Sequence, residues 1–264
     1  MIFSKIRQST KKAGRLAGRK PRVPDGVRAY AIGDVHGRDD LLGDLLTQIE
    51  ADIAKRPLAR NHIIMLGDLI DRGPDSCGVL ERLRRFNVAG CELHVVSGNH
   101  EEVLLRLLEG EYGILPSWLK FGGEETLKSY GADVERIRCA DEPTGLRLIR
   151  AAIPATHQAF LRSLDDTVRV GDYLFVHAGI RPLVALADQS QNDLRWIRQP
   201  FLSDDRDHGF MVIHGHTITD EVAEKSNRIG IDTGAYQTGK LTALGIEGTL
   251  RWYLEAGGPR GGSD

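Results

Sequence analysis

Five short apolar segments recur along the chain, and polar residues follow each of them. The segments lie within residues 27–34, 62–68, 92–99, 172–179 and 209–216. Each has the aliphatic content and length of a buried strand, about four to six residues. Each ends in glycine together with aspartate, asparagine or histidine. The pattern therefore predicts five strands whose ends carry polar side chains.

Helical periodicity separates the first three predicted strands and follows the third. The first helix is indicated by five apolar residues: Leu41, Leu42, Leu45, Leu46 and Ile49. The helix after the third strand should end at Gly110, and its apolar face is formed by Val103, Leu104, Leu107 and Leu108. The section 101–165 is rich in helical pattern, whereas 228–254 alternates like antiparallel strands. This alternation of strands and helices favours a one-domain α/β architecture over residues 25–255.

Composition and charge add little to this picture except at the two ends. The chain has 264 residues with a net charge of −2, and residues 1–22 hold eight lysines and arginines but no acid. We expect residues 1–24 to form a disordered basic arm rather than a nucleic-acid or lipid contact, although a transit peptide remains an alternative. The stretch 256–264 is expected to be a flexible tail.

The chain is expected to be a cytoplasmic protein without a membrane span. No run of 18 or more apolar residues occurs, so no spanning helix is predicted. The three cysteines are too few and too irregularly spaced for a disulfide framework or a zinc knuckle, which favours a reducing compartment. No nucleic-acid partner is expected.

Most residues at the predicted strand ends are of types that bind metal ions, and two arginines accompany them. These residues are Asp34, His36, Asp68, Asp71, Arg72, Asn99, His100, His177, Arg181, His214 and His216. Carboxylate, imidazole and amide ligands without thiolate suit manganese, iron or zinc better than calcium. The candidates exceed one tetrahedral shell, so two ions that share a carboxylate and clamp a phosphate fit better. Any one of these residues alone could be an ordinary turn or core residue. Because all five strand ends carry metal-binding residue types, a single shared site is favoured.

The motifs "GDVHG", "GDLIDRG", "GNHE", "HAG" and "GHT" together resemble those of the calcineurin-like metallophosphoesterases. Over about residues 28–250 the chain is most similar to the bacterial and phage phosphoprotein phosphatases, which act on Ser/Thr phosphate. The resemblance implies a four-layer α-β-β-α sandwich with two mixed sheets and a dinuclear site at the strand carboxyl ends. It also implies hydrolysis by attack of a metal-bridging water, with two Mn²⁺ ions, or iron or zinc, as cofactors.

The same resemblance assigns the metal ligands. One ion would take Asp34, His36 and the bridging Asp68, and the other would take Asp68, Asn99, His177 and one histidine of "HGHT". The family motif is Gly-His-x-His, which matches the frame that starts at Gly215. His216 is therefore the implied ligand, Ile218 replaces the second family histidine, and His214 lies outside the frame.

The resemblance also implies the catalytic and phosphate-binding residues. His100 would protonate the leaving alkoxide, and Asp71 would orient it and keep it protonated. Arg72 would hold phosphate oxygens. Arg198 of "DLRWIR" would be a second clamp, with a surface helix arginine as the alternative. Ser97 stands where the family commonly has arginine, so one phosphate-contacting arginine is either missing or replaced by Arg181 or Arg198.

The sequence leaves three functions in competition. A Ser/Thr protein phosphatase acting on a phosphoprotein or a small phosphoester is the first prediction. A dinucleoside polyphosphate hydrolase is the alternative, since symmetric diadenosine tetraphosphatases share "GDVHG" and "HAGI", although they more often carry Asp where this chain has Glu101. A non-catalytic binding module on the same fold is the third, and the intact ligand set argues against it.

Overall fold

Two five-stranded sheets form the centre of the computed structural model, which describes residues 19–258. The first sheet has the order β10-β9-β1-β2-β3 and the second has β4-β5-β6-β8-β7. In the first sheet the bounds are β1 Val27–Ile32, β2 Arg60–Met65, β3 Cys91–Val95, β9 Lys240–Glu247 and β10 Leu250–Gly257. In the second they are β4 Thr167–Val170, β5 Tyr173–Val176, β6 Met211–His214, β7 Ala223–Glu224 and β8 Arg228–Gly230. Both sheets are mixed: β1, β2 and β3 run parallel, as do β5, β6 and β8.

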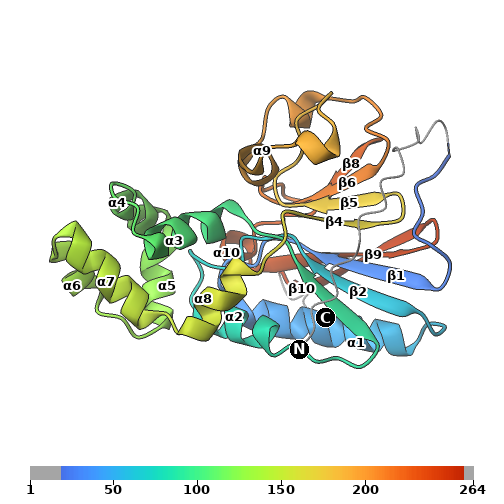
Figure 1. The fold of residues 1–264 in the computed structure, drawn as a ribbon. Coiled ribbons are helices and arrows are strands. Elements are labelled where there is room, and N and C mark those ends of the chain that lie inside the picture. The colour runs from blue at the N-terminus through green and yellow to red at the C-terminus, as the bar shows by residue number, and fades with distance from the viewer. Residues whose placement is uncertain (1–18, 259–264) are drawn as a thin grey trace.

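The two sheets stack face to face with helices outside them, as Figure 1 shows. Strand alternation explains the stacking, because successive side chains point to opposite faces. In β1, Ala29 and Ala31 face the second sheet while Tyr30 and Ile32 face the helices. In β5, Phe175 likewise faces the first sheet. The predicted α/β fold with two mixed sheets is confirmed.

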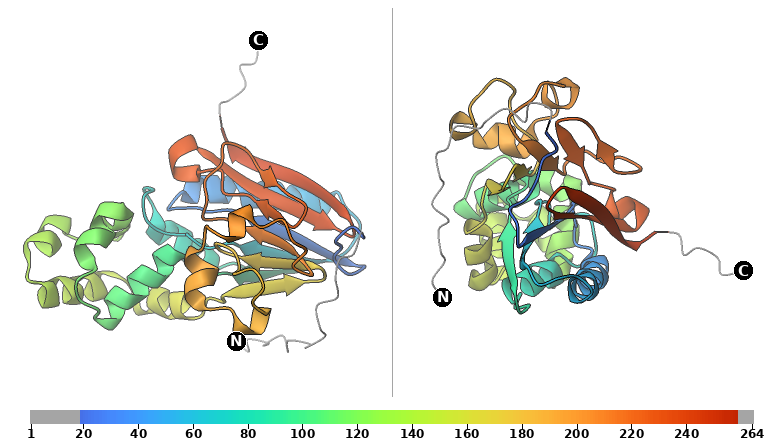
Figure 2. Two further views of the ribbon diagram at one scale, coloured as in Figure 1. Left: turned by 90° about the horizontal axis from the view of Figure 1, so that it is seen from above. Right: turned by 90° about the vertical axis from the view of Figure 1, so that its right-hand side faces the viewer.

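The helices divide into those that cover the sheets and those that form a separate lobe. α1 (Asp39–Ala54) and α2 (Ser76–Arg84) cover the first sheet, and α9 (Gln191–Trp196) covers the second. The lobe extends to one side of the sheets in Figures 1 and 2. It comprises α3 Asn99–Glu109, α4 Leu115–Trp118, the π-helical segment η1 Leu119–Gly123, α5 Glu124–Ser129, α6 Val134–Cys139, α7 Glu142–Ala152 and α8 Ala155–Arg162. Short elements complete the fold: η2 Leu186–Asp188, η3 Phe201–Ser203 and α10 Ala235–Thr238.

The predicted elements are present, with one error in pairing. All five predicted strands form, α1 buries its five predicted residues, and α3 ends at Gly110 in the left-handed conformation. The segment 228–254 is not a set of three neighbouring antiparallel strands. β9 and β10 do pair antiparallel, but β8 lies in the other sheet, parallel to β6. The difference arises because β9 returns to pair with β1.

Each of the two segments predicted to be flexible includes residues that pack against the domain. Residues 1–18 of the predicted arm and residues 259–264 of the predicted tail lie outside the described residues. Val23 is buried and donates its N–H to the carbonyl of Gly248 at 3.0 Å. β10 continues to Gly257, and Ala256 is buried. The packed domain therefore extends beyond the expected bounds of 25–255 at both ends.

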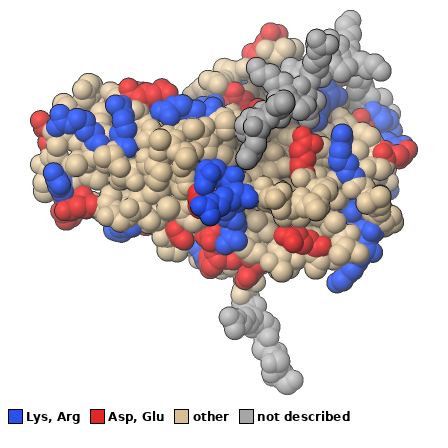
Figure 3. All heavy atoms as spheres, turned by 60° about the horizontal axis from the view of Figure 1, so that its bottom comes forward, with Lys and Arg blue, Asp and Glu red and all other residues tan. Residues whose placement is uncertain are grey.

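The surface carries both acidic and basic side chains. Figure 3 shows acidic and basic side chains interspersed over one face. Among the described residues, no helix has the length and apolar character needed to cross a membrane.

Candidate active site

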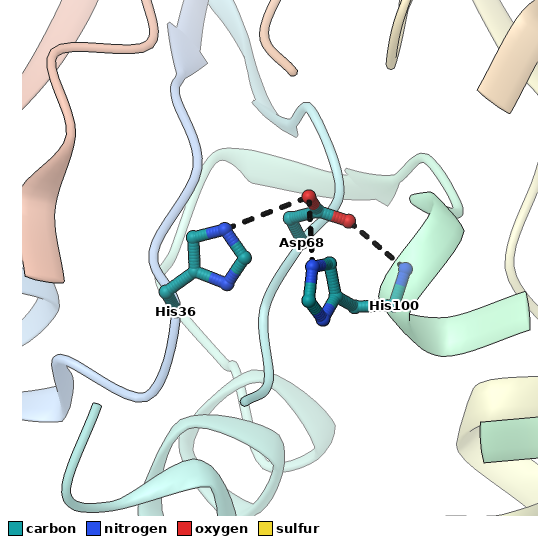
Figure 4. A group of neighbouring side chains, drawn as sticks. All are labelled: His36, Asp68 and His100. Carbon is teal, nitrogen blue, oxygen red and sulfur yellow. Dashed lines mark hydrogen bonds and ion pairs between the residues drawn. The ribbon is translucent and has the colours of Figure 1, made fainter. Parts of the chain in front are cut away.

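Asp68 lies at the centre of a cluster formed by loops that follow five strands. Its carboxylate oxygens lie 3.5 Å from Nε2 of His36, 3.4 Å from Nε2 of His177 and 4.0 Å from Nε2 of His100. Figure 4 shows the rings of His36 and His100 directed at this carboxylate. These residues follow β1, β2, β3 and β5, so the strand ends meet as the sequence predicts.

The ring of His177 extends the cluster to the other side of Asp68. Its Nε2 atom lies 3.0 Å from Oδ1 of Asn99 and 3.2 Å from Nδ1 of His216. Its Nδ1–H donates to the carbonyl of Leu66 at 2.8 Å. This bond places the lone pair on Nε2, which points into the cluster and is available to a cation. His36 has the same tautomer, because its Nδ1 is bonded to the carbonyl of Ile70 at 2.9 Å, but its Nε2 lone pair accepts an N–H of Arg72 at 3.0 Å.

Two buried polar atoms at this cluster have no partner in the protein. Oδ2 of Asp34 accepts the N–H of His216 at 2.9 Å, while Oδ1 accepts nothing. Nε2 of His216 is also without a partner. Within residues 19–258, only Thr217 adds a third such atom. Because buried polar atoms are normally satisfied, these orphans fit a site built for ions and their ligands.

The protonation states fit cation binding as well. Burial would raise the pKa of Asp68, but the imidazoles of His177, His100 and His36 outweigh it and hold that pKa far below its usual range. Burial lowers the pKa values of His36 and His216 to about 3, so both rings are neutral at neutral pH. Unprotonated carboxylate and neutral imidazole are the forms that ligate metal ions.

The ligand loops adopt strained backbone conformations. Six non-glycine residues in the described chain have positive φ, and five of them are predicted site residues: His36, Asp68, Asp71, Arg72 and His216. Their φ values run from 44° to 71°. Such conformations cost about 1–3 kcal/mol each and persist where the surroundings impose them. The strained residues therefore lie in the same loops as the sequence motifs.

Glu101 holds two of these loops together, a role that sequence reasoning missed. Its carboxylate accepts backbone N–H groups of Asp68 at 2.9 Å, Leu69 at 2.8 Å, Ile70 at 3.3 Å and Gly98 at 2.8 Å. The signal available in the sequence was a glutamate three residues after the helix N-cap, which forms one half of a capping box. Burial raises the pKa of Glu101 to about 7, and the charge of Asp68 adds to this shift.

His100 and Asp71 form a buried pair. Nδ1 of His100 lies 2.7 Å from Oδ2 of Asp71, so its Nε2 faces Asp68. Burial opposes the charged ring, but Asp68 and Asp71 raise the pKa of His100 above its ordinary value. Two residues of the lobe also bind Asp71: the Trp118 indole donates to Oδ2 at 3.0 Å and Thr126 donates to Oδ1 at 2.6 Å. The sequence predicts only that residues 101–165 are rich in helix, and it assigns Trp118 and Thr126 no role.

Arg72 reaches the cluster beside His36. Its Nη1 lies 3.0 Å from Nε2 of His36, and its guanidinium lies over the ring of Tyr236 at 4.9 Å. Its backbone N–H donates to the carbonyl of Gly122 in the lobe at 3.1 Å. Gly122 has φ 117°, and a Cβ there would lie 2.5 Å from the backbone nitrogen of Arg72. The lobe therefore needs glycine at this contact.

The other predicted arginines differ in position. Arg198 donates to the carbonyl of His216 at 3.3 Å, and its charge lowers the pKa of His177 and His216 after the larger effect of burial. Arg181 instead forms a two-fold ion pair with Asp193 at 2.9 and 2.6 Å, and none of its hydrogen bonds reaches a residue of the cluster. Ser97 is buried, and its N–H donates to the carbonyl of Asp165 at 2.8 Å.

His214 lies apart from the metal-type cluster. Its ring packs edge-on against Phe201, with ring centres 5.2 Å apart, and Nδ1 donates to the carbonyl of Gly215 at 3.0 Å. Two groups of possible metal ligands share Asp68. One contains His36 and His100, and the other contains His177 and His216. His216 thus joins the cluster, whereas His214 belongs to the packing of the second sheet.

Known proteins share sequence and fold with this chain. The model of the calcineurin-like phosphoesterase family matches residues 27–238. A symmetrical bis(5'-nucleosyl)-tetraphosphatase of Methylobacillus flagellatus is 27% identical over 84% of this chain and 93% of its own length. Serine/threonine-protein phosphatase 2 of Escherichia coli is 28% identical over 83% of this chain and 92% of its own length. The chain spans about half the length of several other tetraphosphatases that it matches, between 44% and 48%.

A solved structure shares the fold. A candidate diadenosine tetraphosphatase superposes with a TM-score of 0.62 at 22% identity, covering 89% of this chain and 95% of the other. The family uses divalent metal ions, and the His and Asp groups around Asp68 form a suitable site. With a family match over most of the chain and a site of this composition, the chain belongs to the calcineurin-like phosphoesterase family.

Proposed function

We propose that this protein is a dinuclear metal-dependent hydrolase of dinucleoside polyphosphates of the diadenosine tetraphosphate type. The observation that carries the phosphoester chemistry is the convergence of five strand ends on Asp68. The substrate class is supported by the similarity to tetraphosphatases, which extends over nearly the whole length of the M. flagellatus relative. The first prediction from the sequence, a Ser/Thr phosphatase, is not confirmed and becomes the second candidate.

The proposed ligands form two groups around Asp68. One ion would be held by Asp34 and His36, and the other by Asn99, His177 and His216, with Asp68 between them. Mixed imidazole and oxygen ligands favour Mn²⁺, with iron or zinc as alternatives. When bound, the ions supply positive charge for the phosphate and a water acidic enough to attack phosphorus.

The chain's own residues would bind the phosphate and deliver a proton. Arg72 and Arg198 lie near opposite groups of the cluster, at His36 and His216, and would hold phosphate oxygens from two sides. His100, with a raised pKa, would donate its Nε2 proton to the leaving oxygen, while Asp71 fixes the ring.

Aromatic side chains beside the proposed phosphate clamp favour a nucleotide. Tyr236 stacks under the Arg72 guanidinium. Phe121 is 61% exposed and precedes Gly122, whose carbonyl binds the Arg72 backbone. An exposed ring near a phosphate site is suited to stack on a base.

The second candidate, a protein Ser/Thr phosphatase, is favoured by the His100–Asp71 pair and by the E. coli relative. An alkoxide is a poor leaving group and gains most from an acid of this kind. The nucleoside diphosphate released from a tetraphosphate needs less proton donation.

A direct comparison of substrates tests the proposal. The metal-free chain, reconstituted with Mn²⁺, is given diadenosine tetraphosphate or a phosphoserine peptide, and kcat/KM is measured for each. We expect a preference for the dinucleotide and ADP as the sole nucleotide product of symmetric cleavage. A preference for the peptide would select the second candidate, and AMP with ATP would reject symmetric cleavage.

Two lobe residues provide a matched test of base recognition. Phe121→Ala should raise KM for diadenosine tetraphosphate about 10-fold, the value of one lost stacking contact of about 1–1.5 kcal/mol. Tyr112 is equally exposed, at 61%, and Tyr112→Ala should leave KM unchanged. Neither change should alter turnover of a small aryl phosphate.

A further inference from the structure

A second group of metal-type side chains lies on β2 and β3, distinct from the Asp68 cluster. We call His62, Glu92 and His94 the β2–β3 cluster. His62 pairs directly with Glu92 across the two parallel strands, and His94 is two residues further along β3. All three side chains therefore lie on one face of the sheet. It is the face of Ile64, which packs against the second sheet.

The three ligand atoms have the spacing of a metal site. Nδ1 of His62 lies 2.9 Å from Nε2 of His94, and the carboxylate oxygens of Glu92 lie 3.7 Å from the first nitrogen and 3.8 Å from the second. Ligands about 2.0–2.1 Å from a tetrahedral zinc ion are about 3.3 Å from one another. The observed separations lie on both sides of this value, so small side-chain shifts would accommodate an ion.

The accessibility of the cluster suits a site with one open position. The His62 and His94 side chains are buried or nearly so, whereas Glu92 is 43% exposed. The ring centres lie 5.1 Å apart with 27° between the ring planes, and the two facing nitrogens lie 2.9 Å apart. Three protein ligands and one solvent position is a common zinc arrangement.

The carboxylates near the β2–β3 cluster outnumber the cations, which favours cation binding. Glu92 and Asp165 place negative charge near His94, and Arg60 places one positive charge near both histidines. Burial lowers the pKa of both rings, so both are neutral at neutral pH, and the N–H that one ring donates to the other would move to its other ring nitrogen when an ion binds.

We propose that His62, Glu92 and His94 bind a zinc ion at a non-catalytic site that ties β2 to β3. The site lies on the strands, whereas the Asp68 cluster lies in the loops beyond their carboxyl ends. Without an ion, one neutral histidine donates a hydrogen bond to the other. The experiment must therefore distinguish zinc binding from this hydrogen bond alone.

Zinc stoichiometry tests the proposal in the full chain. Metal-free protein is loaded with Zn²⁺, passed through a desalting column and analysed for zinc per chain. We expect His94→Gln to bind one zinc fewer than the unchanged protein. His208→Gln is the matched control, because His208 is a half-buried histidine that likewise has a lowered pKa and belongs to none of the metal-type groups in the described chain. Equal stoichiometry in all three proteins would overturn the proposal.

Two further measurements guard against a misfolded variant and against signal from the Asp68 cluster. Glu92→Gln changes only a half-exposed carboxylate and should weaken zinc binding at this site at least about 10-fold. In a chain that carries Asp68→Asn, the zinc that remains should give an anomalous scattering peak between His62 and His94 in crystals. No peak there at saturating zinc would show that the histidines only hydrogen-bond to each other.

Discussion

Trp118 donates its indole N–H to Oδ2 of Asp71 at 3.0 Å, and it does so from the helical lobe rather than from either sheet. The same oxygen is bonded to His100 at 2.7 Å, and Thr126 of the lobe binds the other oxygen at 2.6 Å. Both oxygens of Asp71 are therefore fixed by the lobe. The lobe thus determines where the proposed acid, His100, is held.

Trp118→Phe should reduce activity in a way that depends on the leaving group. A hydrogen bond to a charged group contributes about 1.5–3 kcal/mol, so its loss should lower kcat for an alkyl phosphate by about 10- to 100-fold. An aryl phosphate, whose leaving group needs little protonation, should lose much less. Trp196→Phe is the control, because the Trp196 indole binds Glu102 at 3.3 Å, away from the pair. Equal losses on both substrates would indicate a structural role alone.

Asp68→Asn should abolish metal binding and hydrolysis together. Asp68 is the carboxylate common to both ligand groups, and an amide removes its charge and one ligand oxygen. We expect a loss of at least about 10³-fold in kcat for an aryl phosphate, roughly 4 kcal/mol of transition-state stabilisation. Metal content by mass spectrometry should fall with it. Asp44→Asn changes an exposed acid and should have no effect, whereas full activity of Asp68→Asn would refute the assignment.

His216→Asn should weaken metal binding much more than His214→Asn. Nδ1 of His216 lies 3.2 Å from Nε2 of His177 inside the cluster, while His214 packs against Phe201. We expect the affinity to fall more than about 10-fold for the first change and only a few-fold for the second. Competition with a chromogenic chelator measures both. The reverse order would mean that the motif frame is misplaced by two residues.

Glu101→Gln should destabilise the loops that carry Asp68 and Gly98. The carboxylate accepts four backbone N–H groups, and a glutamine offers one oxygen and an unwanted donor instead. Each unsatisfied buried donor costs about 1–3 kcal/mol, so urea denaturation should show a loss of at least about 2 kcal/mol. Glu109→Gln, at the exposed end of the same helix, is the control. Unchanged stability would show that the loops do not depend on Glu101.

The strands and the metal-type residues were predictable because they depend on local pattern. Strand length, helical spacing and the glycine-flanked motifs can each be recognised within a short segment of sequence. The predicted ligands Asp34 and His216 do lie together, because the His216 backbone N–H donates to Oδ2 of Asp34 at 2.9 Å. Pairing between distant segments was less predictable. β8 entered the other sheet because the pairing of β9 with β1 depends on contacts that no local pattern encodes.

The parts of the site that escaped prediction are those supplied by long-range contacts. Trp118 lies 47 residues from Asp71 along the chain, and Glu101 bonds to loops about 30 residues away. Residue type also failed to separate Arg181 from Arg198, because only packing shows that Asp193 occupies the first guanidinium. Spacing alone cannot reveal such partners.

The pH dependence of stability should report the burial of His214. Burial lowers its pKa to about 4, against the hydrogen bond to Gly215, whereas the unfolded value is about 6.5. The unfolded chain therefore binds more protons between these values. The stability that the neutral His214 ring contributes to the folded chain is fully present above about pH 6.5. It is lost as the pH falls towards 4, and the free energy of unfolding then decreases by about 3 kcal/mol.

Urea denaturation of metal-free protein between pH 7 and pH 4 measures this loss. The free energy of unfolding of the unchanged protein should fall by about 3 kcal/mol more over this range than that of His214→Asn. His36 and His216 also have lowered pKa values, but they titrate in both proteins and cancel in the comparison. Comparing slopes removes any stability that the variant loses at every pH. Parallel curves would mean that His214 is protonated as easily in the folded chain as in the unfolded one.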